Sequence, residues 1–162
     1  LEIVVSDMTV LRNHGTSWEW TYILDTFNNE IIASSLSSKR GDIKPYFDTL
    51  EQLKTKIKGA EHPVILHTDQ GAVYSSRAYQ KAHLNYNIIR SMSRSGTPTD
   101  NPVIEALNGW IKDELYYDYD YHKVDDLPKL ISEYIIYFNT LRPAYALKYK
   151  TPVQYKHDLG FE

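Results

Sequence analysis

A short apolar run, Val64-Ile65-Leu66, restricts the possible folds more than any other segment. It follows Pro63 and leads directly into the polar residues 67–71. Consecutive apolar residues rich in β-branched side chains are typical of a strand covered on both faces, as in the centre of a parallel sheet. The run therefore predicts a central strand of an α/β fold.

The segments around this run complete an expected order of elements. Apolar, β-branched runs predict strands near residues 3–5, 20–26 and 31–35, with the turn-prone Asn28-Asn29 between the last two. Helical spacing of apolar residues predicts helices over 43–57, 76–83, 102–115 and 126–141, and a last strand lies at 88–89. The expected N-caps of the first three helices are Asp42, the pair Ser75-Ser76 and Asn101. The sum is a five-stranded mixed sheet, three antiparallel strands then two parallel ones, flanked by helices.

Composition limits the chemistry. The 162 residues suit one domain, 1–162, with a single hydrophobic core. No cysteine is present, which excludes a disulfide scaffold, a zinc finger and a thiol nucleophile, so any metal is bound by oxygen or imidazole. No stretch approaches the roughly 20 apolar residues that span a bilayer. We expect a cytoplasmic protein that does not bind membranes.

Charge and the start of the chain bear on partners. The net charge of −3 argues against a stand-alone DNA binder, because DNA affinity comes mainly from Lys and Arg. The chain enters a strand immediately, without a leading loop or initiator Met. This start indicates a fragment whose N-terminal DNA-binding domain lies upstream.

Carboxylates fall at informative places on the expected elements. Asp7 is expected at the end of the first strand, Asp69 just past the buried strand, and Glu105 in the first turns of the helix that begins at Pro102. If the first and fourth strands are neighbours, Asp7 and Asp69 meet at one end of the sheet. Asp25, near the end of the second strand, is a rival first carboxylate.

The helix that carries Glu105 presents a polar face to these carboxylates. Asn101, Glu105, Asn108 and Lys112 share that face, opposite the apolar residues of the helix. Hard oxygen ligands without cysteine or clustered histidine favour Mg²⁺ or Mn²⁺ over zinc. Two such ions, about 3.5–4 Å apart, would activate the attacking oxygen and stabilise the leaving oxygen in phosphodiester displacement.

Several segments resemble the integrase catalytic core of bacterial insertion-sequence transposases, in the retroviral-integrase superfamily. The 35 residues 70–104 separate Asp69 from Glu105, the spacing after which this Asp-Asp-Glu family is described. The segments that carry the resemblance are His67-Thr68-Asp69-Gln70-Gly71, Tyr74-Ser75-Ser76, residues 91–101, Glu105, Lys112-Asp113-Glu114, Asp7-Met8-Thr9, Tyr22-Ile23-Leu24-Asp25, Tyr137-Phe138-Asn139, Arg142-Pro143, Leu147 and Thr151-Pro152. Together they cover essentially the whole chain.

The resemblance implies an RNase H-like fold in which Asp7, Asp69 and Glu105 are the catalytic residues and hold two metal ions. The implied reaction is nicking of DNA at element ends, followed by attack of the freed 3′-hydroxyl on another phosphodiester. Lys112, Arg94 and Asn101 are the expected DNA contacts. The implied partners are transposon ends, target DNA and further copies of the chain, as a dimer or higher multimer at the bacterial nucleoid.

Some residues depart from the family or have plainer interpretations. Val4 and Ala144 stand where the family often has Trp and His, which bears on subfamily and end recognition. His67 could be a ligand or could pack at the strand end, and Gly71 is expected to permit the turn that presents Asp69. The Tyr-rich residues 116–121 could stack on bases or pack against the last helix.

Two other functions remain open. A decayed copy would be a catalytically inactive DNA-binding or oligomerisation module, although the intact triad argues against this. An RNase H-type nuclease would use the same fold without strand transfer, since fold alone does not decide function. The spacing of 35 residues and residues 93–101 favour the transposase.

Overall fold

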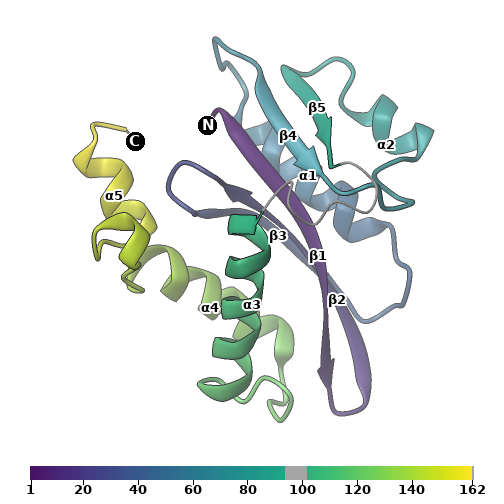
Figure 1. Cartoon of the computed structure of the whole chain (residues 1–162). Coiled ribbons are helices and arrows are strands. Elements are labelled where there is room, and N and C mark those ends of the chain that lie inside the picture. Colours follow the sequence, from purple (N-terminus) through teal and green to yellow (C-terminus); the bar gives the residue numbers. More distant parts are fainter. Residues whose placement is uncertain (94–101, 162) are drawn as a thin grey trace.

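The computed structural model describes residues 1–93 and 102–161 (Figure 1). The described elements follow the order expected from the sequence. They are β1 (Ile3–Asn13), β2 (Thr16–Asp25), β3 (Ile31–Ser37), α1 (Lys44–Lys56), β4 (Val64–Thr68), α2 (Arg77–Ala82), β5 (Ile88–Met92), α3 (Pro102–Tyr117), α4 (Leu127–Thr140), the 3₁₀ turn η2 (Tyr145–Leu147) and α5 (Pro152–Asp158). Within the described residues no helix is long and apolar enough to cross a membrane.

The strands form one sheet in the order β3-β2-β1-β4-β5. β1 pairs with β2, and β2 with β3, in antiparallel fashion. β1 pairs with β4, and β4 with β5, in parallel. The predicted five-stranded mixed sheet is therefore confirmed, with β1 at its centre.

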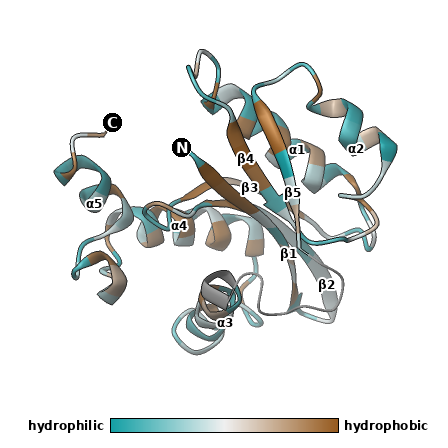
Figure 2. Cartoon of the chain, turned by 45° about the horizontal axis from the view of Figure 1, so that its top comes forward, coloured by the Kyte–Doolittle hydropathy of each residue, from teal (hydrophilic) through white to brown (hydrophobic). Residues whose placement is uncertain are grey.

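Helices cover the sheet from both sides and create two separate cores. Alternation along β1 sends Val4 to one face and Val5 to the other. The first core packs Val5 and its neighbours on β2 under α3 and α4, and the second packs Val4 and Leu66 against α1 and α2. Figure 2 shows β4 and the start of β1 as mostly hydrophobic, while the outer helices mix apolar and polar residues.

β1 is longer than the sequence analysis predicted. It continues past residue 5 to Asn13, because β2 pairs with it along this whole length. His14 and Gly15 both have positive φ in the connecting turn, as two-residue hairpin turns that match the strand twist require. β4 pairs only with Ile3–Val5 of β1, so the rest of β1 extends beyond β4 and pairs with β2 alone (Figure 1).

This length corrects the position of Asp7. The residue lies in the middle of β1, opposite Tyr22 of β2, and not at the end of the strand. Its side chain is on the face that carries Val5, because the two residues are two apart. Asp7 therefore faces α3 at the point where β1 leaves its parallel partner.

The described residues cover β4 on one face only, which corrects the expected burial on both faces. Val64 and Leu66 are buried against the core under α1, but Ile65 on the opposite face is half-buried. Its neighbours in register, Ile3 and Ile89, are 43% and 51% exposed. The reason is that the core under α3 and α4 draws residues from β1, β2 and β3 but none from β4 or β5 among those described.

The helix starts agree with the sequence at Ser76 but differ at Asp42. Ser76 caps α2 by accepting a hydrogen bond from the backbone N–H of Tyr79. The N-cap position of α1 is Ile43, whereas Asp42 accepts from the N–H of Lys44 at 3.0 Å and from the Ser37 hydroxyl at 2.7 Å. The predicted N-cap was therefore one residue too early. The predicted cap at Asn101 lies outside the described residues.

Candidate metal centre

Two carboxylates meet beside the junction of β1 and β4. The parallel pairing of β1 with β4 ends at Val5 and His67, and Asp7 and Asp69 each follow two residues later. Asp69 is the first residue after β4. Burial raises the pKa of the half-buried Asp7 carboxyl, and the charge of Asp69 raises it further. The charge of Asp69 therefore reaches Asp7, and the role of the two carboxylates as metal ligands stays a prediction.

The turn after β4 orients the Asp69 side chain. The backbone N–H of Gly71 donates to Asp69 Oδ1 at 2.7 Å. A Cβ atom added to Gly71 would lie 2.8 Å from the same oxygen. Gly71 is therefore required by the close approach of the carboxylate, which is a different reason from the backbone freedom that the sequence analysis assumed.

Asn108 of α3 connects the helix to the carboxylate pair. Its Nδ2 donates to Asp7 Oδ2, and its Oδ1 accepts from the hydroxyl of Tyr22, the residue opposite Asp7 on β2. The tyrosine hydroxyl fixes the orientation of the amide, because it donates to the oxygen and leaves the NH₂ group for Asp7. The sequence analysis placed Asn108 on the polar helix face but did not assign it to the site, and it gave Tyr22 no role.

Lys112 and Glu105 lie on the same helix as Asn108. Lys112 is exposed one turn further along, and its charge lowers the pKa of Asp7, against the effect of burial. Glu105 is exposed in the first turn of α3. Among the residues that the structure describes, no group of three His, Asp or Glu side chains is close enough to hold a metal ion.

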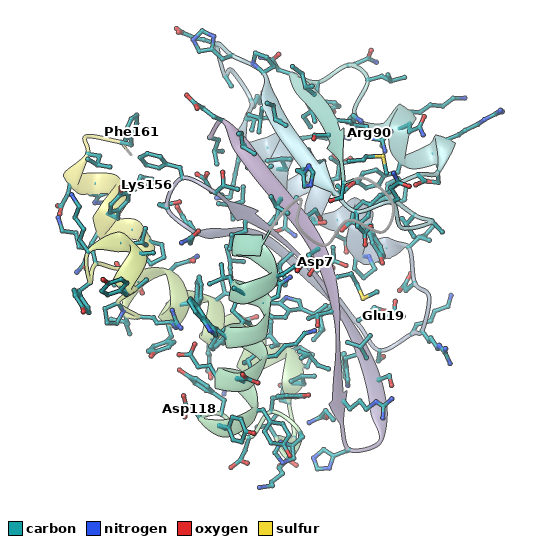
Figure 3. The ribbon with its side chains drawn as sticks, viewed as in Figure 1. Asp7, Glu19, Arg90, Asp118, Lys156 and Phe161 are labelled. Atoms are coloured by element: carbon teal, nitrogen blue, oxygen red, sulfur yellow. The ribbon has the colours of Figure 1, made fainter. Side chains whose placement is uncertain are left out.

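The arrangement therefore brings together part of the predicted site. Asp69 and Lys112 both lie close enough to Asp7 to affect its pKa, and Figure 3 shows Asp7 on β1 beside α3. The role of Glu105 as the third ligand stays a prediction. Arg94 and Asn101, predicted as DNA contacts, lie outside the described residues.

The donor set fits a hard divalent cation. The converging groups are carboxylate oxygens, the ligands that Mg²⁺ and Mn²⁺ prefer. Asp7 and Asp69 carry like charges close together, with Asp7 partly removed from water. A cation between them would offset both the repulsion and the burial that raise the pKa of Asp7.

His67 and Asp25 lie outside this centre. The ring nitrogens of His67 are each 2.9 Å from a hydroxyl, Nδ1 from Ser91 Oγ and Nε2 from Ser93 Oγ. Both ring nitrogens therefore connect β4 to β5 and to the residue that follows it, which agrees with the interpretation that His67 packs at the strand end. Asp25 lies opposite Val4, toward the other end of the sheet, and accepts from the N–H of Phe27 at 3.0 Å.

Glu114 holds α3 to the end of α4. Its Oε2 accepts from Arg142 Nε at 2.7 Å and from the Tyr134 hydroxyl at 3.0 Å. A glutamate on a helix is ordinarily a solvated surface charge, but the Glu114 side chain is only 13% exposed. Asn139 of α4 makes a second connection, as its side chain both accepts from the N–H and donates to the carbonyl of Ile31 at 2.9 Å.

The Tyr-rich segment divides into two groups. Tyr119 and Tyr121 pack against the core under α3 and α4, in line with the packing interpretation. Tyr116 and Tyr117 are 46% and 76% exposed.

Solved structures identify the fold class. The chain is similar to the HTLV-2 integrase catalytic core domain in complex with magnesium, with a TM-score of 0.69 and 22% identity over 94% of each chain. It is also similar to the catalytic core domain of BIV integrase, with a TM-score of 0.66 and 14% identity over 98% of this chain and 95% of that one. The fold is therefore that of retroviral integrase catalytic cores, which is RNase H-like.

Sequence comparison identifies the family. Two family models described as "Integrase core domain" match residues 1–98 and 86–152. This chain belongs to the integrase core domain family.

Curated relatives are transposases. The putative transposase InsK for insertion sequence element IS150 of Escherichia coli is 37% identical over 153 residues, which is 94% of this chain and 53% of the relative. The transposase for insertion sequence element IS904 of Lactococcus lactis is 30% identical over 96% of this chain and 61% of the relative. The chain spans about half to three fifths of the length of these relatives.

Proposed function

We propose that this chain is the catalytic core of an insertion-sequence transposase and that Asp7, Asp69 and Glu105 bind two Mg²⁺ or Mn²⁺ ions for DNA strand cleavage and strand transfer. The observation that carries the proposal is the approach of Asp7 and Asp69 beneath the polar face of α3. Membership of the integrase core domain family and the transposase relatives support it.

The protein side chains contribute orientation and charge. Asn108 and Tyr22 hold the Asp7 carboxylate in one rotamer, and Gly71 does the same for Asp69. Lys112 would bind a DNA phosphate next to the reacting phosphate, because it lies close enough to Asp7 for its charge to lower the pKa of that carboxyl. Metal ions bound by these carboxylates would activate the attacking oxygen and stabilise the leaving oxygen.

The proposed substrates are the ends of a mobile element and the target DNA, in the bacterial cytoplasm at the nucleoid. The proposal includes self-association, because two DNA ends must be held together for joining. Integrase catalytic cores of this fold have been solved in dimeric and trimeric forms, and one similar chain belongs to a retroviral intasome.

The test combines metal binding with DNA cleavage. Mn²⁺ is titrated calorimetrically into wild type, Asp69→Asn and Glu105→Gln, and each protein is assayed for Mn²⁺-dependent nicking of supercoiled DNA. We expect wild type to bind and nick, and both variants to lose these properties. Asp113→Asn removes an exposed carboxylate of the same helix and is the matched control, expected to behave as wild type.

The outcomes separate the alternatives. Unchanged metal binding in Asp69→Asn and Glu105→Gln would show that the assigned ligands are wrong. If wild type binds DNA but does not bind metal and does not nick DNA, the chain is an inactive binding module. Hydrolysis of an RNA–DNA hybrid without joining of element-end DNA would identify an RNase H-type nuclease.

A further inference from the structure

Two side-chain amides occupy the outer edge of β3. This strand lies at one end of the sheet order, beside β2. The backbone N–H of Ser34 donates to Gln52 Oε1 at 3.0 Å, and Gln52 Nε2 donates to the Ser34 carbonyl at 2.9 Å. Earlier on the strand, Asn139 makes the same pair of hydrogen bonds with the N–H and the carbonyl of Ile31, both at 2.9 Å. At both positions the backbone groups that point away from β2 are therefore occupied.

Each amide takes the place that a residue of a neighbouring strand would have. In an antiparallel ladder, a hydrogen-bonded residue exchanges both its N–H and its C=O with the residue opposite. A carboxamide has an acceptor oxygen and an NH₂ donor, so it can complete the same exchange with one residue. The N···O distances at Ser34 and Ile31 lie in the range of ladder hydrogen bonds. A strand that added to β3 would have to displace both amides.

The two amides reach the edge from opposite faces of the sheet. Gln52 lies on α1, on the face where Ala33 is buried, and Asn139 lies on α4, on the face where Ile31 is buried. Between the two contacts the pairing of β2 with β3 shifts by one residue, which leaves Ile32 without a partner. Bulges and covering helices are two means by which proteins protect a sheet edge from pairing with another chain. β3 combines both.

The sequence of β3 would otherwise suit the addition of a strand. Residues 31–36, Ile-Ile-Ala-Ser-Ser-Leu, contain no charge, no proline and no glycine. Uncharged segments of this length that are rich in β-branched and apolar residues pair readily with extended chains when their edge is open. Ser34 and Leu36 are only half-buried, so this end of β3 is within reach of solvent.

We propose that Gln52 and Asn139 close β3 to strand addition and so prevent a second copy of this chain from pairing with it, β3 against β3. The association that they exclude is an antiparallel pairing of identical strands about a twofold axis. The self-association included in the proposed function then uses other surfaces of the molecule. The inference depends on the backbone contacts of β3 and not on the metal site or on DNA.

Sedimentation equilibrium of the whole chain without DNA or metal tests the closed edge. In Gln52→Ala/Asn139→Ala both amides are lost, and we expect the association constant to exceed that of wild type at least about tenfold, because each pair of Ser34 residues can form new backbone hydrogen bonds. Gln52→Lys/Asn139→Ala loses the same amides but places a charge beside the edge, so it should sediment as wild type. Gln52 is exposed, so α1 accommodates either replacement.

A control variant and hydrogen exchange locate the new contact. Gln80→Ala removes a glutamine of α2 whose Nε2 donates to the Ser75 carbonyl at 3.0 Å, away from β3, and it should sediment as wild type. The N–H of Ser34 should exchange faster in dilute Gln52→Ala/Asn139→Ala than in wild type. Its protection should return at concentrations where this variant associates.

The outcomes decide the proposal. A Gln52→Ala/Asn139→Ala variant that sediments as wild type at every concentration would show that the amides do not close the edge. Equal association of Gln52→Lys/Asn139→Ala would also overturn the proposal, because it would trace the effect to the loss of stability that both variants share. Thermal melting verifies that each variant is folded. Metal titration and DNA nicking by wild type decide the proposed function separately.

Discussion

At the scale of single residues, close approach fixes the Asp69 carboxylate. Its Oδ1 receives the N–H of Gly71 and occupies the space into which a side chain at residue 71 would project. Asp7 is held by different means, because Asn108 and Tyr22 come from two other elements of the fold. Each carboxylate thus has one fixed orientation before any ligand arrives, which lowers the cost of organising the site on binding.

Gly71→Ala tests this orientation. The new Cβ would meet Asp69 Oδ1 at 2.8 Å, so the carboxylate must rotate away from the site. We expect metal affinity or nicking to fall by roughly 10- to 100-fold, the usual effect of disturbing the groups around metal ligands. Isothermal titration with Mn²⁺ measures this change.

Gly109→Ala is the matched control. Gly109 lies inside α3, and a Cβ there meets nothing within 4 Å. Replacing it should leave metal binding unchanged and stabilise the chain by about 0.5–1 kcal/mol, as a glycine removed from a helix interior does. Normal Mn²⁺ binding by Gly71→Ala would show that Asp69 does not need its observed orientation.

At the scale of elements, α3 depends on α4 for its position. Glu114 connects the two helices through Arg142 and Tyr134, with side chains of the ion pair only 13% and 20% exposed. Breaking a pair removed from water leaves a charge without its partner, which is more costly than losing an exposed pair. The direction of α3, and with it Asn108 and Lys112, therefore depends on a contact far from the carboxylates.

Arg142→Gln should lower the free energy of unfolding by about 2 kcal/mol. This loss is smaller than that expected for a fully buried ion pair, because water still reaches both groups and Tyr134 still donates to Glu114. Urea denaturation measures this loss. Lys129→Gln breaks the exposed Lys129–Glu133 pair of α4 and should have no measurable effect. A stability loss no larger for Arg142→Gln than for Lys129→Gln would mean that the Glu114 contact does not hold the helices together.

Sequence patterns predicted those elements and contacts that depend on local periodicity. The order of strands and helices follows from apolar spacing, whereas the pairing of β1 with β4 was a condition that the structure supplies. The length of β1 could not be predicted, because residues 6–13 show neither an apolar run nor regular alternation and are stabilised as a strand by pairing with β2.

Side-chain contacts between distant segments were also missed. Asn108 reaches Asp7 across 101 residues, and Glu114 reaches Arg142 across 28. A helix pattern indicates which face is polar but not which partner that face meets, since this depends on how α3 is placed by α4. The same limit applies to Tyr22, whose position in an apolar strand predicts burial and not a hydrogen bond to the site.

At the scale of the whole molecule, β1 joins two cores and carries Asp7 between them. The face that bears Asp7 packs under α3 and α4, and the opposite face packs against α1. A ligand that binds Asp7 and Asp69 together would therefore connect β1, β4 and, through Asn108, α3. Its binding energy would add to the stability of the entire domain and not of one loop.

Thermal melting with and without Mn²⁺ measures this coupling. Ligand at 100 times its dissociation constant adds about 2.7 kcal/mol to folding stability, so the Tm of wild type should rise over that in EDTA. Asp69→Asn should show little or no rise, and Asp113→Asn the full one. An equal rise in Asp69→Asn would indicate that Mn²⁺ stabilises the protein at some other place.

The central position of β1 also sets the order in which the molecule can assemble. β1, β2 and β3 pair with their sequence neighbours. The pairing of β1 with β4 forms later, because it joins Ile3 to Ile65, far along the chain. Contacts between residues so far apart form slowly and only after both segments have been synthesised. A nascent chain that has left the ribosome only as far as β3 contains Asp7 but neither Asp69 nor α3. If the proposed cleavage site is correct, copies that end before β4 lack it, and we expect them to leave the DNA of the cell intact.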